Sequence, residues 1–368
     1  MADCTLELEN LNQTYYDLQN KYDECGCGID PCTVTVATAD YNKSLHVAAI
    51  FIILVCSFLG CGLPLLGKYF PRTKINPFII ILGKCMGMGI VLACALVHML
   101  QPGNESLSSV CLPFEFNTTY TAFAYLYAML GAIFMHFLDF CMLHYIAKQQ
   151  KLKDTLEKER ENGGQEQSEQ EMSVKKMKEE EEEEKAILAA DPHMLVHSVL
   201  LDPRVQRTIR LYALQFALTV HSVFIGLTTG VAGQSEVRAL LVALCFHQFF
   251  EGIALGSRIV DTNLKSHAQE ALMVFVFSIS SPVGIAIGIA LSLSLDPNGE
   301  NFLFVQGTFD SVCAGFLLYI GFNLLLRDFP EDMGKYCFRK KYENLMIFGM
   351  FGALWLGAGL MAYIGQYL

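Results

Sequence analysis

Ionisable side chains inside long apolar stretches are the residues of this sequence that could do chemistry, because a buried charge is costly unless it faces a cavity or a partner. They are His98, His136, Asp139, His144, His221, His247, Glu251 and Asp310. His247 and Glu251 are four residues apart and therefore project from the same face of a helix. His221 and His247 lie equally far along the chain from a short turn centred near Gln234, so an antiparallel helix pair brings both to one depth. Two imidazoles and a carboxylate at one depth form a ligand set for zinc, iron(II) or similar first-row metals.

Single buried histidines have a simpler interpretation, since a lone imidazole in a membrane helix is often only a hydrogen-bonding group. We interpret His136 and His144, taken singly, in this way, whereas the spacing of the other three residues favours a metal site. Two glycine pairs of the small-xxx-small type support such a site, and we expect them to let the two helices approach closely enough to share one ion. They are Gly226 with Gly230, and Gly252 with Gly256.

The elements that must position these side chains are membrane-spanning helices. The chain is 53% hydrophobic and only 17% charged, which excludes an ordinary soluble protein. Its apolar residues form stretches of about 20 residues, the length that a helix needs to cross the hydrocarbon of a bilayer. The stretches are 47–67, 77–100, 120–147, 208–231, 237–257, 269–295, 302–326 and 344–367. We therefore predict an all-α, polytopic membrane protein with eight transmembrane helices. Its segments are an outer tail (1–46), helices one to three (47–147), an inner loop (148–207) and helices four to eight (208–367).

The orientation follows from two independent features. With the N-terminus outside, most Lys and Arg residues fall in the inner loops, as the positive-inside rule requires. The acceptor sequons for N-glycosylation all fall on the outer side, at Asn12, Asn42, Asn104 and Asn117. We expect an N-out, C-out glycoprotein of the plasma membrane, with an endosomal or other secretory-pathway membrane as the alternative. Lys84 lies near the cytosolic end of the second span, and we expect it to extend its amine to the interface.

The inner loop and the outer tail contain the other unusual residues. The stretch 151–185, with its glutamate run at 179–184, is predicted to be disordered. Beyond it, His193 and His197 are one helical turn apart, which suits either a metal relay or an interfacial helix. The outer cysteines are interpreted as disulfide-bonded, or alternatively as a metal-binding cluster at the entrance. They are Cys4, Cys25, Cys27, Cys32 and Cys111.

Two segments resemble the paired metal motifs of the ZIP (Zrt-, Irt-like) family of metal transporters, and the likeness is closest to its plant iron-regulated branch. They are His221-Ser-Val-Phe-Ile-Gly226 in the fourth span and His247-Gln-Phe-Phe-Glu-Gly252 in the fifth. The second span from Gly83 to His98, the sixth at Ser281-Pro282 and the seventh from Ala314 to Tyr319 are also similar to the family.

This resemblance implies a homodimer of eight-helix subunits that imports divalent metal ions toward the cytosol, zinc or iron(II) or both, with manganese as a further substrate. The ion is a transported substrate, so no cofactor is expected, and no nucleic-acid partner is expected either. The family's principal metal site corresponds to His221, His247 and Glu251, between helices four and five. A neighbouring second position corresponds to Ser222 and Gln248, which share Glu251. Because water must reach a mid-membrane site from one side at a time, we expect alternating access.

The sequence also departs from the family pattern. Many ZIP proteins have an acid four residues after the fourth-span histidine, where this chain has Ile225, and this favours a single ion. Asn323 occupies a seventh-span position where a carboxylate is common. Other polar residues are candidates for the ion path: His98, Gln101 and Asp310 on the outer side, Asp139 and His144 on the inner side. For Asp139 the expected partner is Lys84 or Arg258.

Two other classes of function must be weighed. An intramembrane zinc-dependent hydrolase is the main alternative, but the chain has no HExxH motif and no evident nucleophile beside a base. A metal-sensing receptor would need a folded cytosolic domain, for which the inner loop is too polar. The ligand set accepts zinc, iron(II), manganese and cadmium, since second-shell geometry decides among them.

Overall fold

A computed structural model describes residues 41–70, 76–113, 116, 120–163, 203–264, 266–292 and 299–366. Within these residues every regular element is a helix, and eight helices are long and apolar enough to cross a membrane, as predicted. The outer tail lies outside the described residues, with Asn12 and four of the outer cysteines, and so do Asn117, the glutamate run, His193 and His197. Cys111 is described and is disulfide-bonded.

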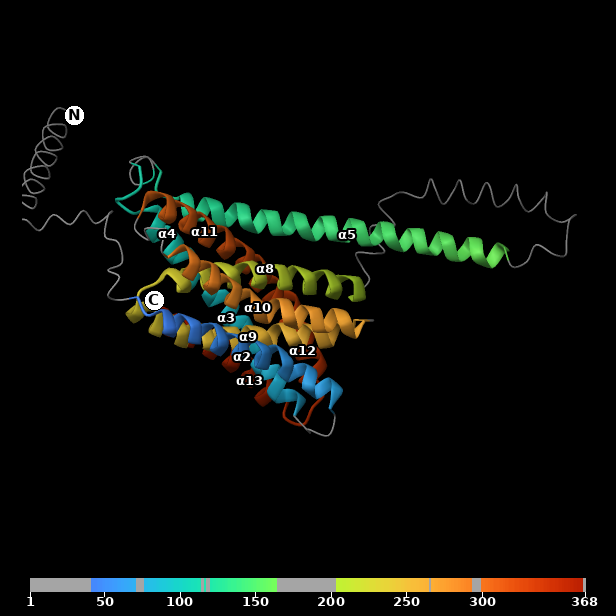
Figure 1. Ribbon diagram of the computed structural model, residues 1–368. Helices are drawn as coiled ribbons and strands as arrows, with labels where there is room; N and C mark the ends of the chain where they lie inside the picture. The colour runs from blue at the N-terminus through green and yellow to red at the C-terminus, as the bar shows by residue number, and fades with distance from the viewer. Residues whose placement is uncertain are drawn as a thin grey trace, which may run out of the picture.

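The helices run side by side as one bundle, in which α2 begins and α13 ends at the same end (Figure 1). In chain order they are α2 (Lys43–Tyr69), α3 (Pro77–Ala93), the π-helix η2 (Cys94–Leu100), α4 (Gln101–Leu107), α5 (Phe123–Gly163), α8 (Pro203–Val231), α9 (Gln234–Thr262), α10 (His267–Leu291), α11 (Glu300–Asn323), the π-helix η4 (Leu324–Asp328), α12 (Phe329–Tyr336) and α13 (Glu343–Gly365). The second span is continuous through α3, η2 and α4, and the seventh through α11, η4 and α12.

The boundaries of the inner loop differ from the prediction. α5 continues to Gly163 instead of ending at residue 147, and it extends well beyond the rest of the bundle (Figure 1). α8 begins at Pro203, five residues before the predicted start at 208. The polar residues at both ends of the predicted loop are thus helical, because hydropathy marks where a helix leaves the apolar core and not where its hydrogen bonding ends.

Polar residues at the helix ends stop the fraying of several spans. The Asn42 side chain accepts a hydrogen bond from the Leu45 backbone N–H at 3.1 Å and caps α2. Asn76 caps α3 in the same way, 3.0 Å from the Phe78 N–H, with Pro77 in the first turn. Two of the predicted glycosylation sites therefore belong to helices: Asn42 is the N-cap of α2, and Asn104 lies inside α4.

The two glycine pairs contact other helices than we expected. A Cβ atom on Gly252 would lie 2.7 Å from the Cys61 backbone nitrogen, so this face of α9 packs against α2. A Cβ atom on Gly230 would lie 2.7 Å from the Cα atom of Gly288, so this face of α8 packs against α10. The expectation that these glycines bring α8 and α9 together is therefore wrong. They instead allow α9 to pack closely against α2, and α8 to pack closely against α10.

The remaining helices separate this core from lipid. α5, α13 and the outer face of α2 carry large exposed apolar side chains, including Phe134, Trp355 and Phe58. The buried apolar core is formed mainly by α3, α8, α11 and the inner face of α13. The second, fourth, fifth and seventh spans are more deeply buried than these outer helices, and they hold most of the functional residues described next.

Candidate metal site

Three side chains from three helices converge in the centre of the bundle. Cys94 at the start of η2, His221 on α8 and Glu251 on α9 each offer a ligand atom, and these atoms all lie within 4.8 Å of one another. All three residues are 0% exposed. The ring of His247 lies beside them, with its centroid 5.9 Å from that of His221. The structure therefore brings two of the three residues predicted from spacing, His221 and Glu251, within reach of one ion, and adds Cys94, which was not predicted. His247 lies beside this group but is not part of it.

The polar atoms of this group are short of hydrogen bonds. Neither ring nitrogen of His221 has a hydrogen-bond partner among the described residues, and the His247 nitrogens and Glu251 oxygens make no hydrogen bond of normal geometry there. The His247 ring does interact with the Ala243 backbone, and Glu251 with the Cys94 thiol. Buried polar groups are almost always paired, because an unpaired one loses its water without compensation. Such a cluster of nitrogen and oxygen atoms fits a cation, and the ligand atoms of Cys94, His221 and Glu251 lie close enough together to share one.

Cys94 could have been found from the sequence by one signal. It lies four residues before His98 in the same apolar stretch, so the two share a helix face. A cysteine inside a span is ordinarily a small apolar residue, so it does not stand out beside the acids and histidines there. The structure also places both residues in η2, a stretch of π-helix, which widens the turn at this point. Such insertions occur frequently at functional sites.

The two residues of the second metal position predicted beside this site, Ser222 and Gln248, are hydrogen-bonded to each other. Gln248 donates its Nε2 proton to the Ser222 Oγ atom at 3.2 Å, and both residues are 0% exposed. Ile225, one turn after His221, adds no ligand atom. The described residues therefore offer one compact group of metal ligands here.

A cavity of about 250 Å³ adjoins the metal site, and we call it the His98 cavity. It is lined by His98, Pro102, Ile225, Thr228, Ala232, Glu236, Leu240, Gln306 and Asp310. The His98 ring centroid lies 5.8 Å from that of His247, so the cavity reaches the histidines of the site. Gln101, predicted together with His98 as a residue of the outer ion path, is exposed. It donates to the Glu105 side chain at 3.2 Å, a hydrogen bond that explains it without a role in transport.

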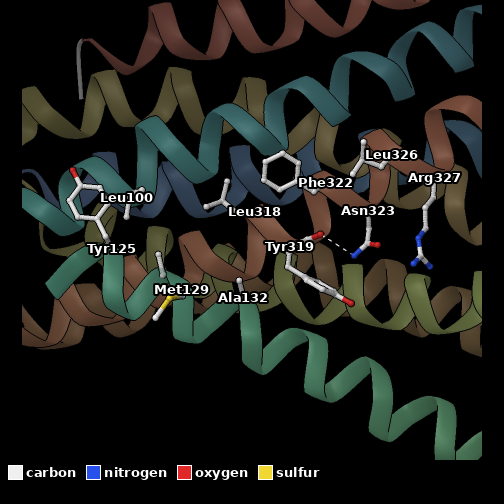
Figure 2. Close-up of a pocket in the computed structure, with 11 residues that line it drawn as sticks. Leu100, Tyr125, Met129, Ala132, Leu318, Tyr319, Phe322, Asn323, Leu326 and Arg327 are labelled. Carbon is white, nitrogen blue, oxygen red and sulfur yellow. Dashed lines mark hydrogen bonds between the residues drawn. The ribbon is translucent and has the colours of Figure 1, made fainter. Parts of the chain in front are cut away.

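The residues predicted for the inner path lie elsewhere. The Tyr319 hydroxyl donates to the Asp139 carboxylate at 2.6 Å, and Asn323 donates to the Tyr319 backbone oxygen at 3.0 Å. Tyr319 and Asn323 line a separate groove of about 570 Å³ between α5 and α11 (Figure 2). His144 is exposed on α5. The structure therefore does not bring these residues to the metal site.

A group of buried ion pairs lies beyond the metal site, and we call it the ion-pair cluster. Its members are Lys84, Arg210, Arg258, Asp261, Asp328 and Asp332. Lys84 is fully buried and contacts Asp261 at 2.7 Å and Asp332 at 2.8 Å. The expectation that Lys84 reaches the interface is therefore wrong, because two carboxylates compensate its charge inside the protein. Arg258 pairs with Asp328 at 2.5 Å. Neither cation is the partner of Asp139.

The helices pass the cavity, the site and the cluster in one consistent order. Along α9, Glu236 and Leu240 line the cavity, His247 and Glu251 are in the site, and Arg258 and Asp261 are in the cluster. The second span has the reverse order, from Lys84 to Cys94 and then His98, as an antiparallel neighbour must. The candidate metal site thus lies between the His98 cavity on one side and the ion-pair cluster on the other.

Comparison with known proteins agrees with this architecture. The sequence profile described as "ZIP Zinc transporter" matches residues 43–365, which include all eight spans. The chain belongs to the ZIP family. Among its relatives, Zinc transporter 5 of Oryza sativa subsp. japonica is 32% identical over 350 residues, covering 93% of this chain and 91% of its own length. Zinc transporter 7 of Arabidopsis thaliana is 33% identical over 300 residues, which is 79% of each chain.

The chain is also similar to a fungal protein. Zinc-regulated transporter 1 of Candida albicans is 27% identical over 292 residues, covering 79% of this chain and 55% of its own length. Family membership makes this ZIP protein a membrane transporter of divalent metal ions, in which the metal is the substrate and not a cofactor. The alternative of an intramembrane zinc-dependent hydrolase is therefore wrong.

Proposed function

We propose that this ZIP protein imports zinc toward the cytosol, and that His221, His247 and Glu251 bind the ion during transit. One observation carries the proposal: buried imidazole nitrogens and carboxylate oxygens that make no hydrogen bond of normal geometry within the described residues converge between α8 and α9. Two nitrogen ligands and an oxygen ligand match the coordination that zinc takes in proteins. The relatives described above carry the name of zinc transporters, which supports zinc as the main substrate. Iron(II) and manganese use similar ligands, so they are the natural competitors in an assay.

A single bound ion accounts for the composition of the site. Ser222 and Gln248 are joined by a hydrogen bond that leaves only the Gln248 Oε1 atom unpaired among the described residues, and Ile225 offers no oxygen where a second carboxylate would bridge two ions. A second divalent ion would add two positive charges to a group of ligands that contains one carboxylate, Glu251, which is costly in a low-dielectric site.

The proposed transport cycle is alternating access. In the N-out orientation the His98 cavity faces the outside, and ions enter it past Asp310 and His98 before they reach His247. The ion-pair cluster then closes the cytosolic side in this conformation. For release, the helices that contribute to the cluster must separate, so that water reaches the site from the cytosol while the cavity closes. We further propose that the protein acts as a homodimer in the plasma membrane.

Uptake into liposomes tests the proposal directly. Purified protein is reconstituted, and entry of zinc is followed with an internal fluorescent indicator, with iron(II) and manganese added as competitors. We expect His221→Ala, His247→Ala and Glu251→Ala each to abolish most uptake, because each removes a coordination bond and Glu251→Ala also removes compensating charge. His136→Ala is the matched control, since His136 is an exposed histidine on α5 whose ring contacts Tyr319. Wild-type uptake by Glu251→Ala at equal protein density would refute the site.

A further inference from the structure

We infer that Cys94 is a further ligand of the transported ion, and that its sulfur makes the site prefer zinc and cadmium to iron(II) and manganese. The inference rests on the proposed function, because it concerns the same site. Its starting point is that the Cys94 Sγ atom lies within 4.8 Å of a ligand atom of His221 and of Glu251. A third helix, the second span, therefore contributes to a site that was predicted between α8 and α9 alone.

The surroundings of Cys94 distinguish it from an ordinary core cysteine. A buried free cysteine usually packs as a small apolar side chain. Cys85, on the same span and also 0% exposed, has this character and belongs to no group of metal ligands among the described residues. Cys94, by contrast, faces an imidazole, that of His221, whose ring nitrogens lack hydrogen-bond partners within the described residues, and its thiol interacts with the carboxylate of Glu251. Two independent features, proximity and unpaired donors, therefore point to a shared ion.

Charge balance at the site gives Cys94 a specific role. A divalent ion held by His221, His247 and Glu251 keeps one uncompensated positive charge in a fully buried site. When the thiol of Cys94 binds the ion, the sulfur–metal bond forms and the thiol proton leaves to water in the adjoining cavity. The thiolate and the carboxylate together then neutralise the ion. Cys94 thus supplies the second anionic ligand that Ile225 does not provide.

Sulfur also changes which ions bind well. Thiolate is a soft ligand that favours zinc and softer ions, whereas manganese prefers oxygen. Two imidazoles, one carboxylate and one thiolate also make up the four ligands of a tetrahedral zinc site. We therefore expect selectivity to depend on Cys94, and the transport chemistry itself to depend on His221 and Glu251.

The first test is spectroscopic and uses the full-length protein in detergent with cadmium as the probe. Cadmium bound to thiolate gives an ultraviolet charge-transfer band, which wild-type protein and the control Cys85→Ser should show. Cys94→Ser should lose the band, and its zinc affinity should fall by at least about tenfold, while its manganese affinity changes less. A band of equal strength in Cys94→Ser, or an unchanged ratio of zinc to manganese affinity, would overturn the inference.

The two proposals fail in different ways. If Glu251→Ala abolishes uptake but Cys94→Ser keeps both the wild-type selectivity and the band, the proposed function stands and the role of Cys94 is wrong. If Glu251→Ala transports zinc like wild type, the site itself is wrong. Should Cys94→Ser not fold, zinc-edge X-ray absorption of wild-type protein and His221→Ala replaces it. A zinc shell without sulfur in wild type, or one whose sulfur is unaffected by His221→Ala, would contradict ligation by Cys94.

Discussion

Lys84 on α3 and Asp332 on α12 form a buried ion pair, with the lysine Nζ atom 2.8 Å from a carboxylate oxygen although the residues are 248 positions apart. Both side chains are at most 6% exposed. Removing one member of such a pair leaves a buried charge without compensation, which costs about 3–5 kcal/mol. We therefore predict that Lys84→Met strongly lowers the melting temperature of the purified protein in detergent.

The matched control for that measurement is Lys335→Met. Lys335 also pairs with Asp261, but at 3.4 Å and with its side chain 58% exposed, so the loss should be below about 1 kcal/mol. Equal melting temperatures for Lys84→Met and Lys335→Met would show that the ion-pair cluster does not hold the helices together.

Replacing Ile225 by glutamate tests the single-ion interpretation. Ile225 lines the His98 cavity one turn after His221, so Ile225→Glu places a carboxylate beside the site. We expect two bound zinc ions per chain, or tighter binding with slower release, measured by equilibrium dialysis and stopped-flow release. Ile225→Gln has nearly the same shape without the charge and should keep the wild-type stoichiometry. If neither stoichiometry, affinity nor selectivity changes in folded Ile225→Glu, the carboxylate does not reach the ion.

The contact between α9 and α2 predicts an asymmetry between two glycines. In Gly252→Ala the new methyl group would meet the Cys61 backbone at 2.7 Å, and backbone cannot move aside as a side chain can. We expect a loss of about 1–3 kcal/mol in the free energy of unfolding, with reduced uptake because α9 also carries His247 and Glu251. In Gly62→Ala the methyl group meets nothing within 4 Å, so stability should be unchanged. Thermal melts of both variants would decide, and equal stabilities would argue against this helix packing.

Glycosylation tests the orientation, which remains a prediction. In the N-out topology, endoglycosidase treatment should change the electrophoretic mobility of the wild-type protein. Asn42 is engaged as a helix cap and Asn104 lies inside α4, so we expect Asn42→Gln and Asn104→Gln to keep this shift. A cysteine introduced between residues 160 and 185 should resist membrane-impermeant thiol reagents in intact cells. Its labelling from outside would contradict the eight-span, N-out topology.

The sequence by itself determined the features that depend on local pattern. Eight apolar stretches predicted eight spans, because the length needed to cross a bilayer is a property of each stretch alone. The four-residue spacing of His247 and Glu251 placed them on one helix face. Because His247 and His221 lie equally far from the Gln234 turn, an antiparallel helix pair brings these two to one depth. Hairpin geometry links these residues, so no knowledge of distant segments was needed.

Only the tertiary structure decided which neighbour each face meets. Cys94 lies beside His221 and Glu251, Lys84 pairs with Asp332, and Asp139 accepts a hydrogen bond from Tyr319, all through contacts between helices that are distant in sequence. Gly252 likewise faces α2 and not α8. A helical period tells which residues share a face but carries no information on the rotation of one helix about its axis relative to another. That rotation is decided when all the helices pack together, because close glycine contacts and buried charges must be satisfied at the same time.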